Sequence, residues 1–452
     1  MSAIGHKPSS AVIVGLGVTG MSCVRYLAGH GWKIAVTDSR AEPPGRAELA
    51  RFDAAIPTRF GRLDPALLDD AVCVVTSPGV ALSDPFFGVA RERGLPVYGD
   101  VELFALSVDS PVVAITGTNG KSTVTTLVGR MAERAGLHVR VGGNLGTPAL
   151  DLLQAAQQSS RATDLYVLEL SSYQLETTSS LAPVAATVLN ITPDHMDRYA
   201  SVAEYADAKA RIFNHCDTAV LNMDDPLVVA MPHSATRVVG FSLHCGPAAY
   251  CLDKGDEGGG WLVRHGERLM PVAAMKIKGL HNVANALAAL ALGEAAGLPM
   301  SAMLAELAEF TGLPHRSQWV ADVAGVTYVD DSKGTNVGAT LAAVAGLPGQ
   351  LVVIAGGDGK GQDFTPLAAA FRGKVRHAVL IGRDAAAIES AVGGVCSTER
   401  CDSLPAAVRA AARAAHAGDT VLLSPACASL DMFRSYAHRG EVFVSSVKEL
   451  AA

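Results

Sequence analysis

The sequence has few aromatic residues, few charges and no long uncharged hydrophobic run. Phe, Trp and Tyr make up 5% of the 452 residues, and charged residues make up 18%. The longest apolar stretch, 283–298, is interrupted by Gly293 and Glu294 and falls short of the ~18 uncharged residues that suggest a membrane span. Segment 1–15 lacks a basic part followed by an unbroken apolar part, so we expect no signal peptide and a cytoplasmic protein.

The sequence also lacks a zinc-ligand pattern and an excess of basic residues. Its 8 cysteines are scattered without a Cys-x-x-Cys pair, so we expect buried thiols rather than disulfides or zinc ligands. The 37 basic and 44 acidic residues give a net charge of -7, which argues against a nucleic-acid-binding or membrane-surface protein. Hydrophobic residues, by contrast, reach 49%, and 45 glycines occur outside any repeat. We expect several packed cores, with glycines at tight turns and close backbone approaches.

Short apolar runs alternate with Ala- and Leu-rich helical stretches along the whole chain. This alternation predicts α/β domains with mostly parallel sheets that helices cover on both faces. Breaks near Gly99 and at 311–316 predict three such domains, at residues 1–100, 101–312 and 313–452. Segment 223–270, richer in Gly, Pro and charge, is expected to form an antiparallel part of the middle domain. Strands are predicted at 11–14, 34–37, 72–76, 112–116, 165–170, 187–190, 326–329, 351–355, 378–381 and 420–423, and helices at 282–296 and 404–415.

A glycine turn follows the first predicted strand. Gly15, Gly17 and Gly20 form a Gly-x-Gly-x-x-Gly pattern that opens a helix, and the second strand ends at Asp38. Backbone amides at such a turn can hold a diphosphate, and an acid at the second strand end can hold a ribose hydroxyl. The motif alone leaves three interpretations open: a dinucleotide such as NAD, a nucleotide diphosphate, or a tight turn without ligand.

A second glycine loop, at 117–120, follows the strand predicted at 112–116. It continues into Lys121 and Ser122 at the start of a helix. Loop amides can cradle triphosphate oxygens, Lys121 can reach the β- and γ-phosphates, and the Ser122 hydroxyl can ligate Mg²⁺. The strict phosphate-loop pattern has glycine where this chain has Ile115, so the loop is a variant. We predict that it binds ATP.

Three residues downstream could complete a metal site. Glu169 ends a buried strand, where a Mg²⁺ shell needs a carboxylate, although a solvated strand-end acid is the alternative. His195 follows another strand in a polar cluster, and by itself it would more often be a packed loop histidine. Lys209 falls on the apolar face of a helix with Tyr205. A cation there is costly unless it is paired or chemically altered, and the alternative is that its long side chain reaches water.

Several motifs combine along the chain: Thr116-Gly-Thr-Asn-Gly-Lys-Ser-Thr123, Glu169-Leu-Ser-Ser-Tyr-Gln-Leu-Glu176, Asp194-His-Met-Asp-Arg-Tyr199, His281-Asn-Val-Ala-Asn285, His315-Arg316, Asp331-Ser-Lys-Gly-Thr-Asn336 and Leu423-Ser-Pro-Ala-Cys-Ala-Ser-Leu-Asp-Met-Phe433. The combination resembles the Mur ligase family of ATP-dependent amide-forming enzymes over essentially the whole chain. The resemblance implies an N-terminal Rossmann-like domain, a central P-loop ATPase-like domain and a C-terminal Rossmann-like domain. It also implies an ADP-forming ligase that adds D-glutamate to UDP-N-acetylmuramoyl-L-alanine through an acyl phosphate, a cytoplasmic step of peptidoglycan synthesis.

The resemblance further implies the residues that would serve each substrate. ATP would contact Gly117, Thr118, Asn119, Gly120, Lys121, Ser122, Thr123, Asn282, Asn285, Arg316 and Asp331. The UDP-sugar would contact Val18, Thr19, Asp38, Ser39, Arg40, Ser77, Gly79 and Asn144, and D-glutamate would contact Thr335, Lys360, Ser429 and the backbone at Tyr436. Two Mg²⁺ ions would be held by Ser122, Glu169, His195 and Lys209, the last as an N6-carboxylated carbamate. Catalysis would depend on Lys121, His195 and Lys209, with the base that deprotonates the amine unassigned.

Other functions remain as alternatives at this point. Within the same class, they are another Mur ligase or an amide ligase similar to folylpolyglutamate synthase. In a different class, the first glycine motif would also suit an NAD-binding dehydrogenase or a nucleotide sensor. We expect small-molecule substrates only, with no nucleic acid, no membrane insertion and a monomeric protein.

Overall fold

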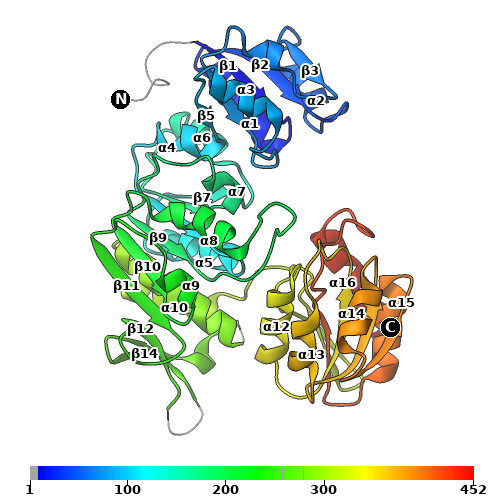
Figure 1. Ribbon diagram of the computed structural model, residues 1–452. Helices are drawn as coiled ribbons and strands as arrows, with labels where there is room; N and C mark the ends of the chain where they lie inside the picture. Colours follow the sequence, from blue (N-terminus) through cyan, green and yellow to red (C-terminus); the bar gives the residue numbers. More distant parts are fainter. Residues whose placement is uncertain (1–8, 256–258, 278, 452) are drawn as a thin grey trace.

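A computed structural model of the chain describes residues 9–255, 259–277 and 279–451. The chain forms three lobes in sequence order, each built around one sheet (Figure 1). Strands alternate with helices in all three, so the α/β prediction is confirmed. Segment 1–8, part of the stretch for which no signal peptide is expected, lies outside the described residues.

The first sheet is entirely parallel, in the strand order β3-β2-β1-β4-β5. Both faces of β1 are buried, because Ile13 packs toward α1 while Val12 and Val14 pack toward α3. The elements of this lobe are β1 (Ser10–Val14), α1 (Val18–Gly29), β2 (Lys33–Asp38), α2 (Arg46–Phe52), β3 (Thr58–Phe60), a 3₁₀ turn (Pro65–Leu68), β4 (Cys73–Thr76), α3 (Pro85–Glu92) and β5 (Val97–Tyr98).

The middle sheet has nine strands in the order β14-β13-β12-β11-β10-β9-β6-β8-β7. Helices α5, α10 and α11 cover one face, and α6, α7 and α8 cover the other. The elements are α4 (Asp100–Ala105), β6 (Val112–Thr116), α5 (Lys121–Arg134), β7 (Val139–Gly143), α6 (Ala149–Gln157), β8 (Leu165–Glu169), α7 (Ser172–Leu175), β9 (Ala185–Val188), α8 (Val202–Ala210), a 3₁₀ turn (Arg211–Phe213), β10 (Thr218–Asn222), α9 (Pro226–Val229), β11 (Arg237–Ser242), β12 (Tyr250–Asp253), β13 (Trp261–Arg264), β14 (Glu267–Pro271), a 3₁₀ turn (Val272–Ala274), α10 (Leu280–Ala295) and α11 (Met300–Glu309).

The third sheet has six strands in the order β15-β16-β20-β17-β18-β19, and β15 alone is antiparallel to its neighbour. Helices α12, α13 and α14 cover one face, and α15 and α16 cover the other. The elements are β15 (Gln318–Val323), β16 (Val326–Asp330), α12 (Val337–Gly346), β17 (Leu351–Gly356), α13 (Thr365–Phe371), β18 (Val375–Ile381), α14 (Ala385–Val392), β19 (Ser397–Arg400), α15 (Leu404–Ala414), β20 (Thr420–Leu423) and α16 (Tyr436–Ala451).

Two expectations for segment 223–270 need correction. Its first strand, β11, is parallel to β10, and only β12, β13 and β14 pair antiparallel to one another, as an extension of the middle sheet. Cys245 and Cys251, expected as thiols, form a disulfide. The loop between β11 and β12 returns on itself and brings their Cα atoms to 5.1 Å, which the sequence spacing does not reveal. The other six cysteines are free, and four of them are buried.

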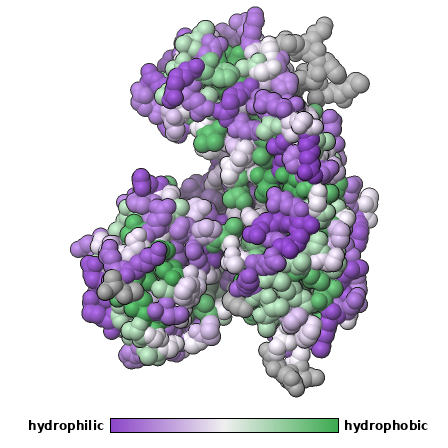
Figure 2. Space-filling view, turned by 180° about the vertical axis from the view of Figure 1, so that it is seen from behind, coloured by the Kyte–Doolittle hydropathy of each residue, from purple (hydrophilic) through white to green (hydrophobic). Residues whose placement is uncertain are grey.

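The first two lobes share a continuous hydrophobic core, whereas the third has cores of its own. An ion pair also joins the first and middle lobes. Arg25 on α1 donates to Asp151 on α6 at 2.7 Å. In the space-filling view, a deep hollow separates the first lobe from the third (Figure 2). Among the described residues, no helix combines the length and apolar character needed to cross a membrane.

Candidate active site

The phosphate loop joins β6 to α5 at the carboxyl edge of the middle sheet. Gly117 and Gly120 have φ of 146° and 86°, a region that favours glycine. A Cβ on Gly120 would also lie 2.4 Å from Asn285 Oδ1. Lys121 folds over the loop and donates to the carbonyl oxygens of Gly117 and Thr118, each at 2.8 Å. Burial lowers the pKa of Lys121, while the nearby charge of Glu169 opposes that shift.

Asn190, which is outside the predicted set of site residues, fixes the shape of this loop. Its Oδ1 accepts from the Asn119 amide at 2.8 Å, and its Nδ2 donates to the Asn119 carbonyl oxygen at 3.1 Å. Its own carbonyl oxygen accepts from the Thr118 amide at 2.9 Å. The only signal in the sequence is a polar residue at the end of the strand predicted at 187–190.

Glu169 lies at the end of β8, beside the start of α5. Its Oε2 accepts from Ser122 Oγ at 2.5 Å and its Oε1 from Asn144 Nδ2 at 2.7 Å. Burial alone would raise the pKa of Glu169, but the charge of Lys121 and these two hydrogen bonds hold it below its usual value. The side chain is 3% exposed, which rules out the alternative of a solvated strand-end acid.

His195 lies in a turn that starts at Asp194. It has φ of 59°, and its Nε2 is 3.7 Å from Asp194 Oδ2. Its ring lies 4.9 Å from that of Tyr173 and 6.4 Å from that of Tyr205, centroid to centroid. Burial lowers the pKa of His195, and the charge of Asp194 opposes that shift.

Lys209, on α8, does not reach water, so the alternative of a solvated lysine is wrong. It is 1% exposed. Its Nζ donates to Thr116 Oγ1 at 3.2 Å and to the Gly117 carbonyl oxygen at 3.0 Å, and it lies over the Tyr205 ring at 4.7 Å. Burial first, and then the charge of Lys121, place the pKa of Lys209 well below its usual value.

No group of three His, Cys, Asp or Glu side chains suited to a metal occurs in the part of the chain that the structure describes. The predicted ligands differ from such a group, because they include a serine hydroxyl and a modified lysine. Of these, the structure brings Ser122 and Glu169 into contact. His195 and Lys209 both approach the ring of Tyr205.

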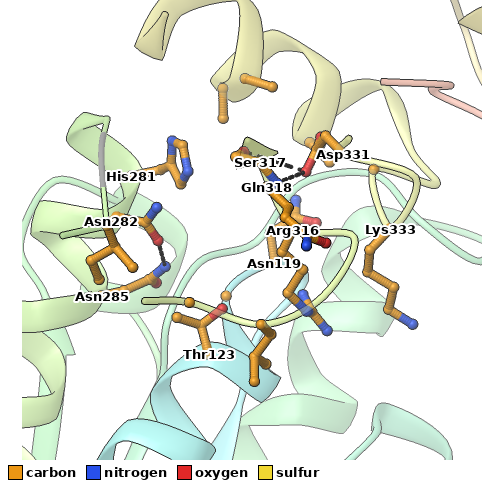
Figure 3. Close-up of a pocket in the computed structure, with 18 of the residues that line it drawn as sticks. Asn119, Thr123, His281, Asn282, Asn285, Arg316, Ser317, Gln318, Asp331 and Lys333 are labelled. Atoms are coloured by element: carbon orange, nitrogen blue, oxygen red, sulfur yellow. Dashed lines mark hydrogen bonds between the residues drawn. The ribbon is translucent and has the colours of Figure 1, made fainter. Parts of the chain in front are cut away.

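A cavity of about 530 Å³ lies between the phosphate loop, α10 and the third lobe. In Figure 3, Asn282 and Asn285 lie on one side and Arg316 and Asp331 on the other, with Asn119 near the centre and Thr123 below. Of the residues predicted for ATP, those that line the cavity are Asn119, Gly120, Thr123, Asn282, Asn285, Arg316 and Asp331. The remaining four are in the phosphate loop and the first turn of α5, outside the lining: Gly117, Thr118, Lys121 and Ser122.

The third lobe contributes charged groups to this cavity. Arg316 Nη2 donates to Ser122 Oγ at 2.6 Å, which connects the third lobe to the phosphate loop. Asp331 accepts from the Ser317 amide at 3.0 Å and from Ser424 Oγ at 2.8 Å. Burial raises the pKa of Asp331 to about 7. Lys333, which the predicted set did not include, also lines the cavity, and burial lowers its pKa to about 8.

A second cavity, of about 660 Å³, surrounds the glycine turn of the first lobe. All eight residues predicted for the UDP-sugar line it: Val18, Thr19, Asp38, Ser39, Arg40, Ser77, Gly79 and Asn144. Asn144 comes from the middle lobe, after β7, together with Ser171, Tyr173 and Gln174. The cavity therefore extends from the glycine turn to Asn144 and Tyr173, which contact the metal-site candidates Glu169 and His195.

Asp38 organises the rim of this second cavity. Its Oδ2 accepts from the Leu16 amide and from Arg40 Nη2, both at 2.7 Å, and its Oδ1 accepts from Arg40 Nε at 2.9 Å. Burial alone would raise the pKa of Asp38, but these hydrogen bonds hold it below its usual value. The acid predicted to hold a ribose hydroxyl is thus already paired with a cation on the cavity wall.

The four residues predicted for D-glutamate lie on the third lobe but do not line the cavity beside the phosphate loop. Lys360 Nζ is 3.9 Å from Asp194 Oδ1, which brings it beside the turn that carries His195. The segment of Ser429 pairs with that of Lys360 through the Asp358–Ala428 bridge. Thr335 lies two residues beyond Lys333, and the carbonyl oxygen of Tyr436 accepts from Ser332 Oγ at 2.8 Å.

Asn336, also outside the predicted set, joins the third lobe to the phosphate loop. Its Nδ2 donates to Asn119 Oδ1 at 3.2 Å and to Asp194 Oδ2 at 3.3 Å, and its Oδ1 accepts from Asn119 Nδ2 at 3.4 Å. The same Oδ1 caps α12 by accepting from the Ala339 amide. Its place at the end of the 331–336 motif is the signal that could have identified it.

Three family models match the chain. They are described as the Mur ligase MurD-like N-terminal domain, the Mur ligase middle domain and the Mur ligase glutamate ligase domain, at residues 9–99, 115–293 and 315–427. Among curated proteins, the UDP-N-acetylmuramoylalanine--D-glutamate ligase of Methylococcus capsulatus is 50% identical over 444 residues, covering 98% of this chain and 95% of the relative. The protein with the same name from Thiobacillus denitrificans is 51% identical over 464 residues, covering 98% and 96%.

Solved structures with the same fold have much lower sequence identity. A pseudomurein peptide ligase type C from Methanothermus fervidus has a TM-score of 0.63 at 16% identity, covering 98% of this chain and all (100%) of that chain. The UDP-N-acetylmuramate-alanine ligase of Thermotoga maritima has a TM-score of 0.60 at 19% identity, covering 98% and 99%. At these identities the likeness shows a shared fold.

Proposed function

The chain belongs to the Mur ligase family, and we propose that it joins D-glutamate to UDP-N-acetylmuramoyl-L-alanine with conversion of ATP to ADP and phosphate. Relatives that bear this name are half identical to it over nearly the full length of both proteins. The family models also cover all three lobes, so the proposal does not depend on one motif alone.

In the structure, two successive hydrogen bonds that link Asn144 to Glu169 and Glu169 to Ser122 support the proposal. Asn144 lines the cavity at the glycine turn, and its Nδ2 donates to Glu169 at 2.7 Å. Glu169 in turn accepts from Ser122 of the phosphate-loop helix at 2.5 Å. A substrate held in the first lobe can therefore present its far end to the phosphates of ATP, as transfer of the γ-phosphoryl group to a carboxylate requires.

The donor set at this junction fits Mg²⁺. Ser122 and Glu169 place a hydroxyl and an ionised carboxylate in contact, and hard divalent cations prefer such oxygen ligands. We propose that these two side chains hold one ion and that His195 and Lys209 hold a second. Bound there, the ions would offset the negative charge of the phosphates and of the carboxylate that approaches them.

For Lys209 we propose a carbamate, formed when its neutral amine adds to CO₂ and releases a proton. Burial and the neutral oxygen partners of Nζ support this proposal. A carbamate would replace a poorly compensated buried cation with an anionic oxygen ligand. His195 would then be a metal ligand and not the base that deprotonates the incoming amine.

The chemistry follows in two steps. The alanyl carboxylate attacks the γ-phosphorus of ATP, giving an acyl phosphate and ADP, while Lys121 and Arg316 hold the phosphate oxygens. The amine of D-glutamate then attacks the acyl carbon, phosphate leaves, and the amine loses a proton. Contacts of Arg316 and Asn336 with the phosphate-loop segment support a role for the third lobe in excluding water from the acyl phosphate.

We propose that residues 1–100 hold the UDP-sugar, 101–312 hold ATP, and 313–452 hold D-glutamate. Asn282 and Asn285 would recognise adenine, and Asp331 and Arg316 would reach ATP from the third lobe. Thr335 and Lys360 would hold the α-carboxylate of D-glutamate, and Ser429 with the backbone at Tyr436 would hold its side-chain carboxylate. The approach of Lys360 to Asp194 supports this placement, since it points the amino-acid residues toward the metal-site turn.

The test is phosphate release from ATP with UDP-N-acetylmuramoyl-L-alanine and either D- or L-glutamate. We expect release with the D-isomer only. No release with either isomer, or equal release with both, would overturn the proposal.

A titration with NAD that leaves the melting temperature unchanged would dismiss the dehydrogenase or sensor alternative. We further propose that the enzyme acts in the cytoplasm as a monomer.

A further inference from the structure

Arg198, which has no role in the function proposed above, makes a contact across the boundary between the first and middle lobes. Its Nη1 donates to the carbonyl oxygen of Pro78 at 2.9 Å, 120 positions earlier in the chain. Its Nη2 pairs with Glu176 at 2.5 Å, and its guanidinium covers the Tyr173 ring at 4.1 Å. The side chain is only 14% exposed, so water competes little for these contacts.

In the first lobe, the residue that Arg198 contacts lines the second cavity, which surrounds the glycine turn and which we propose holds the UDP-sugar. Ser77, Pro78 and Gly79 all line that cavity. Ser77 Oγ donates to the Gly15 carbonyl oxygen at 2.8 Å, so the same turn holds the first glycine of the glycine motif. Arg198 thus binds a backbone carbonyl oxygen of the turn at residues 77–79. The same turn lines the cavity in which we propose that the diphosphate binds.

The middle-lobe end belongs to the turn that carries His195. The backbone amides of Arg198 and Tyr199 both donate to the His195 carbonyl oxygen, at 2.9 and 3.1 Å. Tyr199 Oη donates to the second oxygen of Glu176 at 2.6 Å, so one carboxylate holds both side chains. A shift of Arg198 would therefore move the backbone that positions His195.

We propose that Arg198 is a positioning residue that couples UDP-sugar binding in the first lobe to the placement of His195 in the middle lobe. This inference rests on the proposed function, because it takes the UDP-sugar as the ligand of the first-lobe cavity. The Ser77–Gly79 turn and the turn that carries His195 then become ordered together. The His195 side chain is therefore in position when the UDP-sugar is bound. The coupling is mutual, as linkage between two sites requires.

Arg211 offers a matched control. Like Arg198, it lines the neighbouring cavity of about 750 Å³ and donates to backbone carbonyl oxygens. Its partners, Leu175 at 2.7 Å and Thr178 at 2.9 Å, lie in its own lobe. Arg211→Ala therefore removes an arginine and two of its hydrogen bonds to backbone carbonyl oxygens without touching the first lobe.

The first experiment titrates UDP-N-acetylmuramoyl-L-alanine, without ATP, into the wild-type protein and into each variant by calorimetry. We expect Arg198→Ala to weaken this binding by about tenfold or more, the range for a lost charge-assisted hydrogen bond, and to leave ATP affinity within about twofold. Arg211→Ala should bind the UDP-sugar as the wild type does. Arg198→Lys, which keeps the charge but not the planar fork, should fall between wild type and Arg198→Ala.

The second experiment measures hydrogen exchange at the amides of Arg198 and Tyr199. In the wild type and in Arg211→Ala, the UDP-sugar should slow their exchange, and in Arg198→Ala the Tyr199 amide should no longer respond. Arg198→Ala that melts like the wild type and binds the UDP-sugar equally well would overturn the coupling. So would equal losses of UDP-sugar and ATP affinity in both alanine variants. A wild-type protein that binds no UDP-sugar would overturn the proposed function, and this inference with it.

Discussion

Lys209 Nζ lies 3.0 Å from the carbonyl oxygen of Gly117, so a lysine buried in α8 touches the first residue of the phosphate loop. Lys121 donates to the same oxygen at 2.8 Å. Two lysine amino groups therefore converge on one neutral acceptor inside the protein, an arrangement that burial makes unfavourable when both are charged. Conversion of Lys209 to an anion would turn this repulsion into attraction.

Replacement of Lys209 by alanine should abolish ligase activity, because the proposed carbamate and its metal-ligand oxygens are lost. Added acetate or another short-chain carboxylate should restore part of the activity by occupying the vacated space. The measurement is phosphate release over a series of acetate concentrations. Lys33→Ala, at an exposed position on β2, is the control and should neither lose activity nor respond to acetate. Full activity of Lys209→Ala would contradict the carbamate role.

Replacement of Glu169 by glutamine should lower activity at least tenfold and raise the Mg²⁺ concentration needed for half-maximal rate, because the charge of a proposed metal ligand is lost. The measurement is phosphate release as a function of Mg²⁺ concentration. Glu306→Gln is the matched control, since both acids are 3% exposed and Glu306 pairs with Arg134 away from the site. It should lower the melting temperature without changing the Mg²⁺ requirement. An identical Mg²⁺ response in Glu169→Gln and the wild type would argue against a ligand role.

Two glycines of the first-lobe turn should respond differently to alanine. A Cβ on Gly20 would lie 2.0 Å from the Gly15 carbonyl oxygen, so Gly20→Ala should destabilise the protein by about 1–3 kcal/mol. A Cβ on Gly17 would meet nothing within 4 Å, so Gly17→Ala should keep wild-type stability. It should nevertheless raise the KM for the UDP-sugar, because the new methyl group occupies the place where we propose that the diphosphate binds. Denaturant unfolding and steady-state kinetics distinguish the two effects, and an unchanged KM in Gly17→Ala would exclude close approach at this glycine.

Asp100 should make stability depend on pH between about 4 and 6. Asp100 is 1% exposed and accepts a hydrogen bond from Gln174 Nε2 at 3.2 Å, and burial raises its pKa from 3.8 to about 6. In this window the folded protein keeps the proton that the unfolded chain has lost, so the free energy of unfolding falls as pH rises. Asp100→Asn cannot ionise, so its stability relative to the wild type should rise by up to about 3 kcal/mol between pH 4 and pH 7. Urea unfolding at several pH values is the measurement, and a pH-independent difference would refute the prediction.

Much of the fold and site was predictable because the signals are local. The strand at β6, the glycine loop and the start of α5 follow one another within 112–123, and the structure places all three as predicted. Lys209 was also detectable, since a cation on an apolar helical face stands out in a single helix. β9 begins at Ala185, two residues earlier than predicted, because two alanines give little strand signal although the sheet buries both.

Contacts between distant segments were not predictable. Asn119 and Asn336 are 217 positions apart, and nothing in either motif says that the two amides meet. The Cys245–Cys251 disulfide depends on the path of a loop between two strands, which the spacing of the cysteines does not fix. The parallel course of β11 likewise follows from its position beside β10, whereas its Gly- and Pro-rich surroundings pointed to hairpins.

The amide pair between Asn119 and Asn336 has a consequence for repeated turnover. Neither group carries net charge, so separating them exposes dipoles to water that readily replaces their hydrogen bonds. A buried ion pair at the same place would be far harder to part once assembled. At this one contact, therefore, the third lobe can part from the phosphate loop without separating opposite charges, whereas Arg316 and Lys360 hold it through charged side chains.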